Sequence, residues 1–241
     1  MREPQRQSDT PAATTLVLRW IPLCAAAEFL GIAAAASWYG AVNVLIGEPE
    51  PLLARAGAWV LMTLSAVPEG FVLGGLQAVG ISWFLPGVSR RRWISATVAV
   101  GALGWGIGTF IPLFLVGQDA ASPPPEPGLA VTALFSAAFG LAVGAVFGLV
   151  QLWALPREAR RKTLWIIANA VGWGVGLPCI YVAAQLAGDL TGWVPRITLW
   201  ALGGLAAGAA LGASTGLALL RLSQPASDRA EPRRHGRVPH P

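Results

Sequence analysis

Charged residues and the side chains of soluble chemistry are scarce in this chain of 241 residues. Only 12% of the residues are charged, whereas a soluble domain has about 25%. The single lysine, Lys162, lies in a short basic segment and not in an apolar run, which excludes a Schiff base inside such a run. Both histidines, His235 and His240, lie near the C-terminal end, which argues against a histidine-ligated haem among the apolar runs.

Motifs for metal binding and catalysis are also missing. The two cysteines, Cys24 and Cys179, lie inside apolar runs, and no CxxC pair occurs, so neither a zinc site nor a disulfide framework is predicted. The sequence has no P-loop, no dinucleotide fingerprint, no HExxH motif and no Ser-His-Asp set. We therefore predict no catalytic residue, no metal and no cofactor. No basic face for nucleic acid is evident, because the arginines gather at segment ends.

Apolar residues are abundant, making up 54% of the chain with a mean hydropathy of +0.58. A membrane-spanning helix needs about 20 apolar residues. Six runs meet this requirement, at residues 15–39, 55–84, 93–116, 129–154, 164–187 and 196–221. The sequence therefore predicts an all-α integral membrane bundle of six transmembrane helices, over residues 15–222, with the lipid bilayer as its first partner.

The basic residues predict the orientation of these spans. They follow the second, fourth and sixth runs, as at Arg90, Arg91 and Arg92, whereas the opposite joints hold only Arg55 and Arg196. Lysine and arginine favour the cytoplasmic side, so we predict that both chain ends lie in the cytoplasm. The arginine- and alanine-rich composition is typical of bacteria and places the protein in the inner membrane. We expect residues 1–14 to form a polar N-terminus and the basic, proline-rich residues 223–241 to form a disordered tail.

Small residues recur in the second, fourth and sixth predicted spans. Glycines lie four residues apart along these spans, at Gly70 and Gly74, at Gly140, Gly144 and Gly148, and at Gly204, Gly208, Gly212 and Gly216. Gln77 and Gln151 follow the first two ladders by three residues, and Leu219 holds that place in the third. The simplest interpretation is a repeat of three parallel helical hairpins, at about 15–85, 93–155 and 164–222, around an axis along the membrane normal.

The third and fifth predicted spans share a second motif, Gly-Trp-Gly-x-Gly, at residues 104–108 and 172–176, and the first span holds only a weaker copy at Leu30-Gly31. Together with GxxxGxxQ, this pattern resembles uncharacterised bacterial multi-span membrane proteins, and the resemblance implies no known chemistry. Glycine ladders allow close backbone contact between membrane helices. Two packings are open: the ladders meet one another around the axis, or each ladder packs only against the other span of its own hairpin.

Two acidic residues lie within the predicted spans. Glu28 and Glu69 fall in the hydrocarbon region of the first hairpin, where an ionisable residue is costly and is a functional candidate. Val143 and Leu211 hold the place of Glu69 in the other two hairpins. No cation lies at similar depth, so we expect a neutral carboxyl or one that is bonded to Gln77. A structural bridge between helices and a ligand or proton site are both open.

Other polar groups fall at similar depth. Pro68 precedes Glu69 and is expected to kink the second span, freeing a carbonyl near residues 64–65. Gln77, Gln151 and Asn169 are buried amides that either hold helices together or form part of the ligand or proton site.

Eleven tryptophans fall into two groups. Most lie near the ends of the spans and are typical of an interfacial belt. These are Trp20, Trp83, Trp93, Trp153 and Trp165 at the cytoplasmic side and Trp38, Trp59, Trp193 and Trp200 at the other side. Trp105 and Trp173 lie deeper, between glycines. They either pack against neighbouring helices or stack on a hydrophobic ligand.

The sequence favours a non-enzymatic membrane protein that binds a partner protein, a second copy or a hydrophobic ligand within the bilayer. The main alternative is a small ion- or proton-coupled permease that uses Glu28 and Glu69. A lipid-modifying membrane enzyme is the weaker alternative. These hypotheses differ in whether the two acids face a polar cavity, each other or a dry helix seam.

Overall fold

The computed structural model describes residues 13–47, 49, 51–115, 127–157, 159 and 161–223. All regular elements in these residues are helices: α1 (Ala13–Ile46), α2 (Leu52–Thr63), α3 (Ala66–Ile81), α4 (Arg90–Phe110), the π-helix η1 (Ile111–Leu115), α5 (Leu129–Gln151), α6 (Lys162–Ala187) and α7 (Trp193–Leu222). The predicted N-terminal segment and tail lie almost wholly outside the described residues, as do Glu48, Glu50 and the 116–126 joint.

Six helical stretches are long and apolar enough to cross a membrane, which confirms the predicted number of spans. The second consists of α2 and α3, and the third of α4 and η1. The first span ends at Ile46 and not at residue 39. Residues 40–46 contain no proline, and the helix continues through Gly40 until the chain turns at Gly47, whose φ is +65°.

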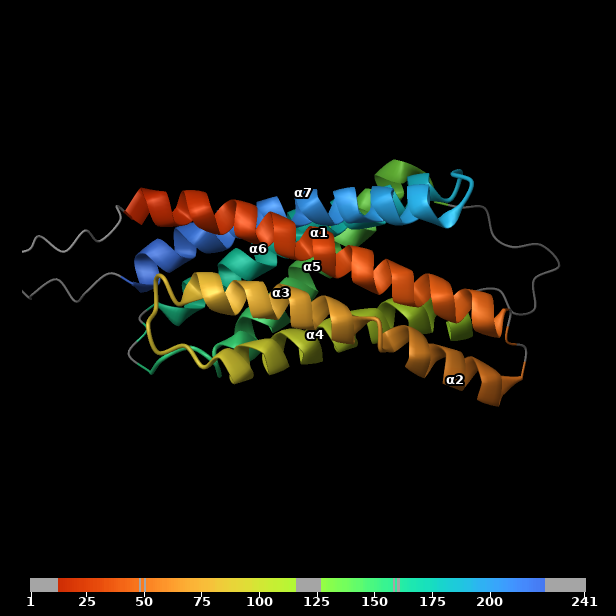
Figure 1. Cartoon of the computed structure of the whole chain (residues 1–241), viewed down its shortest axis with the longest axis horizontal. Coiled ribbons are helices and arrows are strands. Elements are labelled where there is room, and N and C mark those ends of the chain that lie inside the picture. Colours follow the sequence, from red (N-terminus) through yellow and green to blue (C-terminus); the bar gives the residue numbers. More distant parts are fainter. Residues whose placement is uncertain are drawn as a thin grey trace, which may run out of the picture.

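The helices run side by side along the long axis of the molecule, and the start of α1 and the end of α7 lie at the same end (Figure 1). We call this the terminal end, and the opposite end, near Ile46 and Trp193, the distal end. Each span packs against the spans before and after it in the sequence, and α7 packs against α1. The six spans therefore form a closed ring.

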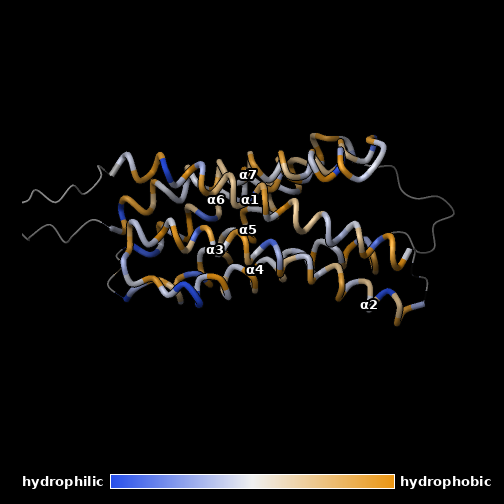
Figure 2. The backbone as a smooth tube through the Cα atoms, viewed as in Figure 1, coloured by the Kyte–Doolittle hydropathy of each residue, from blue (hydrophilic) through white to orange (hydrophobic). Residues whose placement is uncertain are grey.

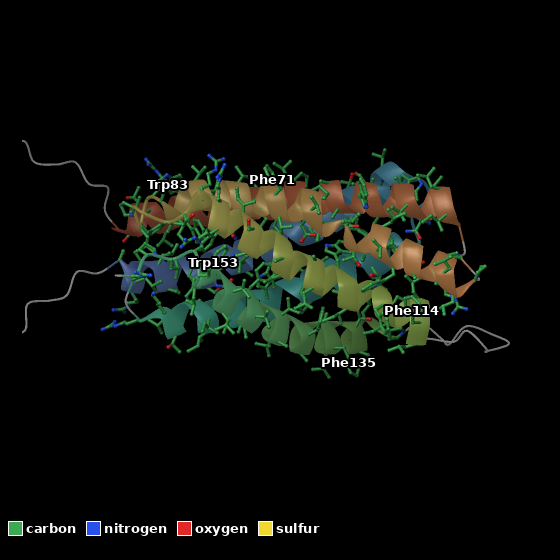
Figure 3. All side chains as sticks on the ribbon, turned by 90° about the horizontal axis from the view of Figure 1, so that it is seen from below. Phe71, Trp83, Phe114, Phe135 and Trp153 are labelled. Atoms are coloured by element: carbon green, nitrogen blue, oxygen red, sulfur yellow. The ribbon has the colours of Figure 1, made fainter. Side chains whose placement is uncertain are left out.

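The outer surface of the ring is apolar. Hydrophobic residues extend along the helices, and hydrophilic residues gather toward their ends (Figure 2). Phe71, Trp83, Phe135 and Trp153 project from the outside of the bundle (Figure 3) and are between 39% and 72% exposed. Such an exposed apolar band suits a lipid environment.

The second span is interrupted where the sequence predicts a kink. Residues 64 and 65, which precede Pro68 in the chain, separate α2 from α3. Pro68 has no N–H for the carbonyl of Leu64, which instead accepts a bond from Val67 N at 3.0 Å. The hydroxyl of Ser65 donates to Met62 O at 2.6 Å. The interruption turns α2 away from the line of α3 (Figure 1).

The glycine ladders of α3 and α5 pack against the helix that follows each of them. A Cβ added at Gly70 would lie 2.7 Å from Val98 Cα of α4, and one added at Gly148 would lie 2.5 Å from Ile166 Cα of α6. Real Cβ atoms essentially never come closer than 3.0 Å to a neighbour. Glycine is therefore required for these helices to approach so closely.

The ladder of α7 packs against α1. A Cβ at Gly212 would lie 2.9 Å from Ile21 Cα, and one at Gly204 would lie 2.9 Å from Glu28 O. The other ladder glycines meet the same partner helices: Gly74 meets α4, Gly140 and Gly144 meet α6, and Gly208 and Gly216 meet α1. Both packings left open by the sequence are wrong, because each ladder faces the first span of the next predicted hairpin.

Three tryptophans assigned to the interfacial belt are buried. Trp20, Trp93 and Trp165 are at most 1% exposed. Each indole N–H donates to a side chain of the adjacent ladder helix: Trp93 to Gln77 Oε1 at 3.4 Å, Trp165 to Gln151 Oε1 at 3.2 Å, and Trp20 to Thr215 Oγ1 at 2.9 Å. The belt prediction is wrong for these residues, because their positions near a span end do not reveal that they face inward. Trp83 and Trp153 are exposed, as expected for a belt.

Candidate functional site

A cavity of about 910 Å³ lies inside the ring and is lined by residues from all six spans. Aromatic side chains form much of its wall, among them Tyr39 of α1, Trp105 of α4 and Trp200 of α7. It extends to the distal end, where Asn43 and Arg55 contribute to the lining. Small-molecule sites in proteins typically have volumes of about 300–1,000 Å³, so this cavity has room for a ligand.

Glu69 is the deep acidic group of the cavity. It lies in the first turn of α3, just after the interruption at residues 64–65, and is 8% exposed. The indole N–H of Trp105 donates to its Oε2 atom, and this is the one hydrogen bond of the Glu69 carboxyl within the described chain. Gly31 of α1 makes room for it, since a Cβ there would lie 3.3 Å from Glu69 Cγ. The sequence did not predict the bond to Trp105.

Glu28 lies in a different environment. It is fully buried in α1 and does not line the cavity. A Cβ at Gly208 would lie 2.8 Å from Glu28 Cβ, which places this acid in the seam between α1 and α7. Neither of its carboxyl oxygens has a hydrogen-bond partner among the described residues. Glu69 therefore lines the cavity, whereas Glu28 lies in the seam between α1 and α7.

The aromatic residues form two groups on the cavity wall. Tyr39 stands between Trp105 and Trp200, with ring centroids 6.0 Å from each. Trp173 stacks on Phe147, with centroids 5.1 Å apart and an angle of 18° between the ring planes. Trp105 and Trp173, the two deep tryptophans of the sequence, thus both line the cavity. Trp200, assigned to the belt, lines it as well.

The buried amides lie outside the cavity. Gln77 and Gln151 accept the indole bonds of Trp93 and Trp165, and the Gln151 amide also donates to Thr97 Oγ1 at 3.2 Å. Asn169 donates to Trp165 O in its own helix at 2.9 Å. None of these three amides contributes to the cavity lining. Their contacts are those of groups that hold helices together, and they do not join Glu69 in one site.

The charges of the cavity are well separated. Arg55 and Glu69 are its two charged lining residues. Fourteen residues separate them, which corresponds to roughly 20 Å along a helical span. Among the described residues, no group of three or more His, Cys, Asp or Glu side chains lies together. Chemically, the cavity offers aromatic faces for apolar or cationic groups and a carboxyl for a hydrogen-bond donor or a cation.

No protein-family model, no curated protein and no solved structure matches this chain. The assignment of a function therefore depends on the geometry of the cavity itself.

Proposed function

We propose that this protein is a non-enzymatic component of the bacterial inner membrane that binds a hydrophobic ligand inside its helix bundle. The observation that supports this proposal most directly is the cavity, which all six spans line and which holds Glu69 at depth. Ligand sites are typically mostly apolar, with a few polar groups that orient the ligand. Here the aromatic wall supplies the apolar surface, and Glu69 supplies the orienting group.

The proposed orientation has both chain ends in the cytoplasm. Its support is the arginine-rich joint at residues 90–92 and the basic residues Arg157, Arg161 and Lys162 at the terminal end of the bundle, against Arg55 and Arg196 at the distal end. In this orientation the cavity extends toward the outside of the cell.

We also propose that the bundle is built from three repeated hairpins. Each odd-numbered span has Trp-Ile in its part near the terminal end, at 20–21, 93–94 and 165–166, and each Trp bonds to the adjacent ladder helix. Eleven residues after each Trp, a glycine faces the following span: Gly31 faces Glu69, Gly104 faces Val143, and Gly176 faces Ala207. This spacing pairs Gly104 with Gly176, and not with Gly172 as the Gly-Trp-Gly-x-Gly motif does. The equivalent contacts support a common origin for the three hairpins.

These contacts favour a register that differs from the one read from the glycine spacing. Gly74 and Gly148 face Ile94 and Ile166, and the glycine that faces Ile21 is Gly212. The third ladder is therefore shifted by one turn. Thr215, and not Leu219, takes the place of the glutamine, and Ala207, and not Leu211, takes the place of Glu69.

Filling the cavity tests the proposed function. Gly104 lines the cavity, and a Cβ there would meet only Val143, at 3.9 Å. Gly104→Phe should therefore occupy the cavity without forcing helices apart. Gly75→Phe is the matched control, because a Cβ at Gly75 meets nothing within 4 Å and Gly75 does not line the cavity.

The measurement is native mass spectrometry of the full chain, purified from the membrane in mild detergent. We expect a small molecule to remain bound to the wild type and to the Gly75→Phe variant and to be lost from Gly104→Phe. Equal retention by all three proteins would show that the molecule binds elsewhere and would contradict the proposal.

A proton-coupled permease is the second candidate, and Glu28 is the observation that favours it. Glu28 is fully buried and has no hydrogen-bond partner among the described residues, which makes it a candidate proton acceptor. If the protein is a permease, proteoliposomes that contain the wild type should acidify their lumen faster under an imposed pH gradient than those that contain the Glu28→Gln variant. Equal rates for both proteins would rule out this use of Glu28.

A further inference from the structure

The cavity holds the Glu69 carboxyl at depth, and among the described residues no cationic side chain lines the cavity near it. Arg55, the other charged lining residue, lies at the distal end. A carboxylate in a low-dielectric site is costly unless a cation or several donors stabilise it. Trp105 supplies one donor, to Oε2. This leaves Oε1 for a group that enters the cavity.

Aromatic rings line the same cavity as this carboxyl. Tyr39, Trp105 and Trp200 form one continuous group on α1, α4 and α7, with the Tyr39 ring 6.0 Å from each of the other two. Trp105 joins this group to Glu69 through its indole N–H. The faces of Trp and Tyr rings attract cations, most strongly where water is excluded. The carboxyl group and the aromatic rings therefore both favour a cationic ligand.

From this geometry we infer that the ligand is a lipophilic organic cation, an amine or a quaternary ammonium or phosphonium ion with an apolar body. Its charged centre pairs with Glu69 and lies against the rings of Tyr39 and Trp105. Its body occupies the remaining aromatic wall, where Trp173 stacks on Phe147. The inference depends on the proposed function, since it specifies the class of ligand that the same cavity binds.

A neutral lipid chain is the main competing occupant. It would fill the apolar part of the cavity but would leave Glu69 with Trp105 as its one partner among the described residues. An anionic amphiphile is the other competitor, because Arg55 lies at the distal end of the cavity. The two competitors and the proposed cation differ in charge, so probes of one shape and opposite charge separate them.

Tetraphenylphosphonium and tetraphenylborate are such a pair. Their binding to the purified full chain in mild detergent is measured by isothermal titration calorimetry. We expect saturable binding of tetraphenylphosphonium, tighter than that of tetraphenylborate by at least about tenfold. Equal or tighter binding of tetraphenylborate would overturn the inference, and this comparison requires no variant.

Two variants test whether Glu69 is the group that binds the cationic probe. Glu69→Gln keeps the size of the side chain and an acceptor for the Trp105 N–H, and we expect it to weaken tetraphenylphosphonium binding by at least about tenfold. Asp189→Asn is the matched control, because it removes one negative charge outside the cavity and should leave binding unchanged. Unchanged binding to Glu69→Gln would overturn the inference.

The outcomes also separate this inference from the proposed function. If wild type binds both probes equally and Gly104→Phe binds neither, the cavity takes hydrophobic ligands without selecting cations. The proposed function then stands, and the inference fails. If Gly104→Phe binds the probes and retains the co-purified molecule as the wild type does, both fail.

Discussion

Glu28 and Glu69 have the same side chain but different surroundings. Glu69 lines the cavity and accepts the indole N–H of Trp105. Glu28 is enclosed between α1 and α7, with no hydrogen-bond partner in the described chain. An unsatisfied buried polar group costs about 1–3 kcal/mol. Removal of the carboxyl should therefore stabilise the fold at Glu28 and destabilise it at Glu69.

Replacement by methionine, which is similar in length and apolar, tests this difference. Glu28→Met should raise the thermal-unfolding midpoint in detergent, by an amount corresponding to about 1 kcal/mol or more, because the cost of the buried carboxyl is lost. Glu69→Met should lower it, because the Trp105 N–H is left unpaired. The measurement is intrinsic tryptophan fluorescence during heating. A lower midpoint for Glu28→Met would mean that its carboxyl stabilises the fold.

At the residue scale, the sequence predicted the interruption near residues 64–65, and both acids that it placed within spans are buried in the bundle. It did not predict which acid faces the cavity, because that depends on the rotation of α1 and α3 about their own axes. Nor did it predict the inward-facing Trp20, Trp93 and Trp165. Their common following residue, isoleucine, and their equal distance from the later glycines were the available signal.

The glycine ladders determine how closely neighbouring spans approach. Lipid chains are as apolar as leucine side chains, so membrane helices gain little from burying leucine and much from close backbone packing. A Cβ at Gly144 would overlap Asn169 O and lie 2.8 Å from Ala170 Cα. The α5–α6 contact therefore has no room for a side chain at this position.

Gly144→Leu should destabilise the bundle. Overpacking of a close contact typically costs about 1–3 kcal/mol, and we expect a corresponding fall in the unfolding midpoint in detergent. Gly75→Leu is the control, since a Cβ there meets nothing within 4 Å, and its midpoint should match that of the wild type. Equal midpoints for the two variants would mean that the α5 ladder is not a packing face.

At the scale of elements, the six spans could be predicted because hydropathy and length suffice to identify a membrane helix. The partners of the ladders could not, because a GxxxG pattern marks a packing face without naming the helix that it faces. The third ladder has four glycines, and its regular spacing allows more than one register. Contacts with Ile21 and Trp20 were needed to distinguish them.

The cavity is a property of the whole ring. Its lining comes from all six spans, and residues as distant in sequence as Tyr39 and Trp200 stand side by side on its wall. No local pattern predicts such a volume, because it depends on how the ring closes between the first and last spans. That closure is made by the α7 ladder on α1, where Gly212 faces Ile21 and Cys24.

A disulfide tests this closure. A Cβ at Gly212 would lie 3.1 Å from Cys24 Cβ and 2.9 Å from Ile21 Cα. The two helices must therefore separate by a few tenths of an ångström to accept it, which brings the two Cβ atoms toward the range of about 3.5–4.5 Å found in disulfides. Oxidation of Gly212→Cys should therefore join the first and last spans through Cys24, and mass spectrometry should detect the linked peptides. Gly75→Cys, on the open face of α3, should give no such link. An unlinked Gly212→Cys protein would contradict the packing of α7 on α1.

The orientation of the whole molecule is the last prediction. Basic residues follow the second, fourth and sixth spans, so the joint at residues 89–92 should face the cytoplasm and the joint at residues 119–126 the outside. In a Cys179→Ser background, where the remaining Cys24 is buried, Ser122→Cys should react with an impermeant thiol reagent added to intact cells. Arg91→Cys should react only after the membrane is opened. Labelling in the reverse pattern would invert the molecule and make the distal end of the cavity cytoplasmic, so that its ligand would enter from inside the cell.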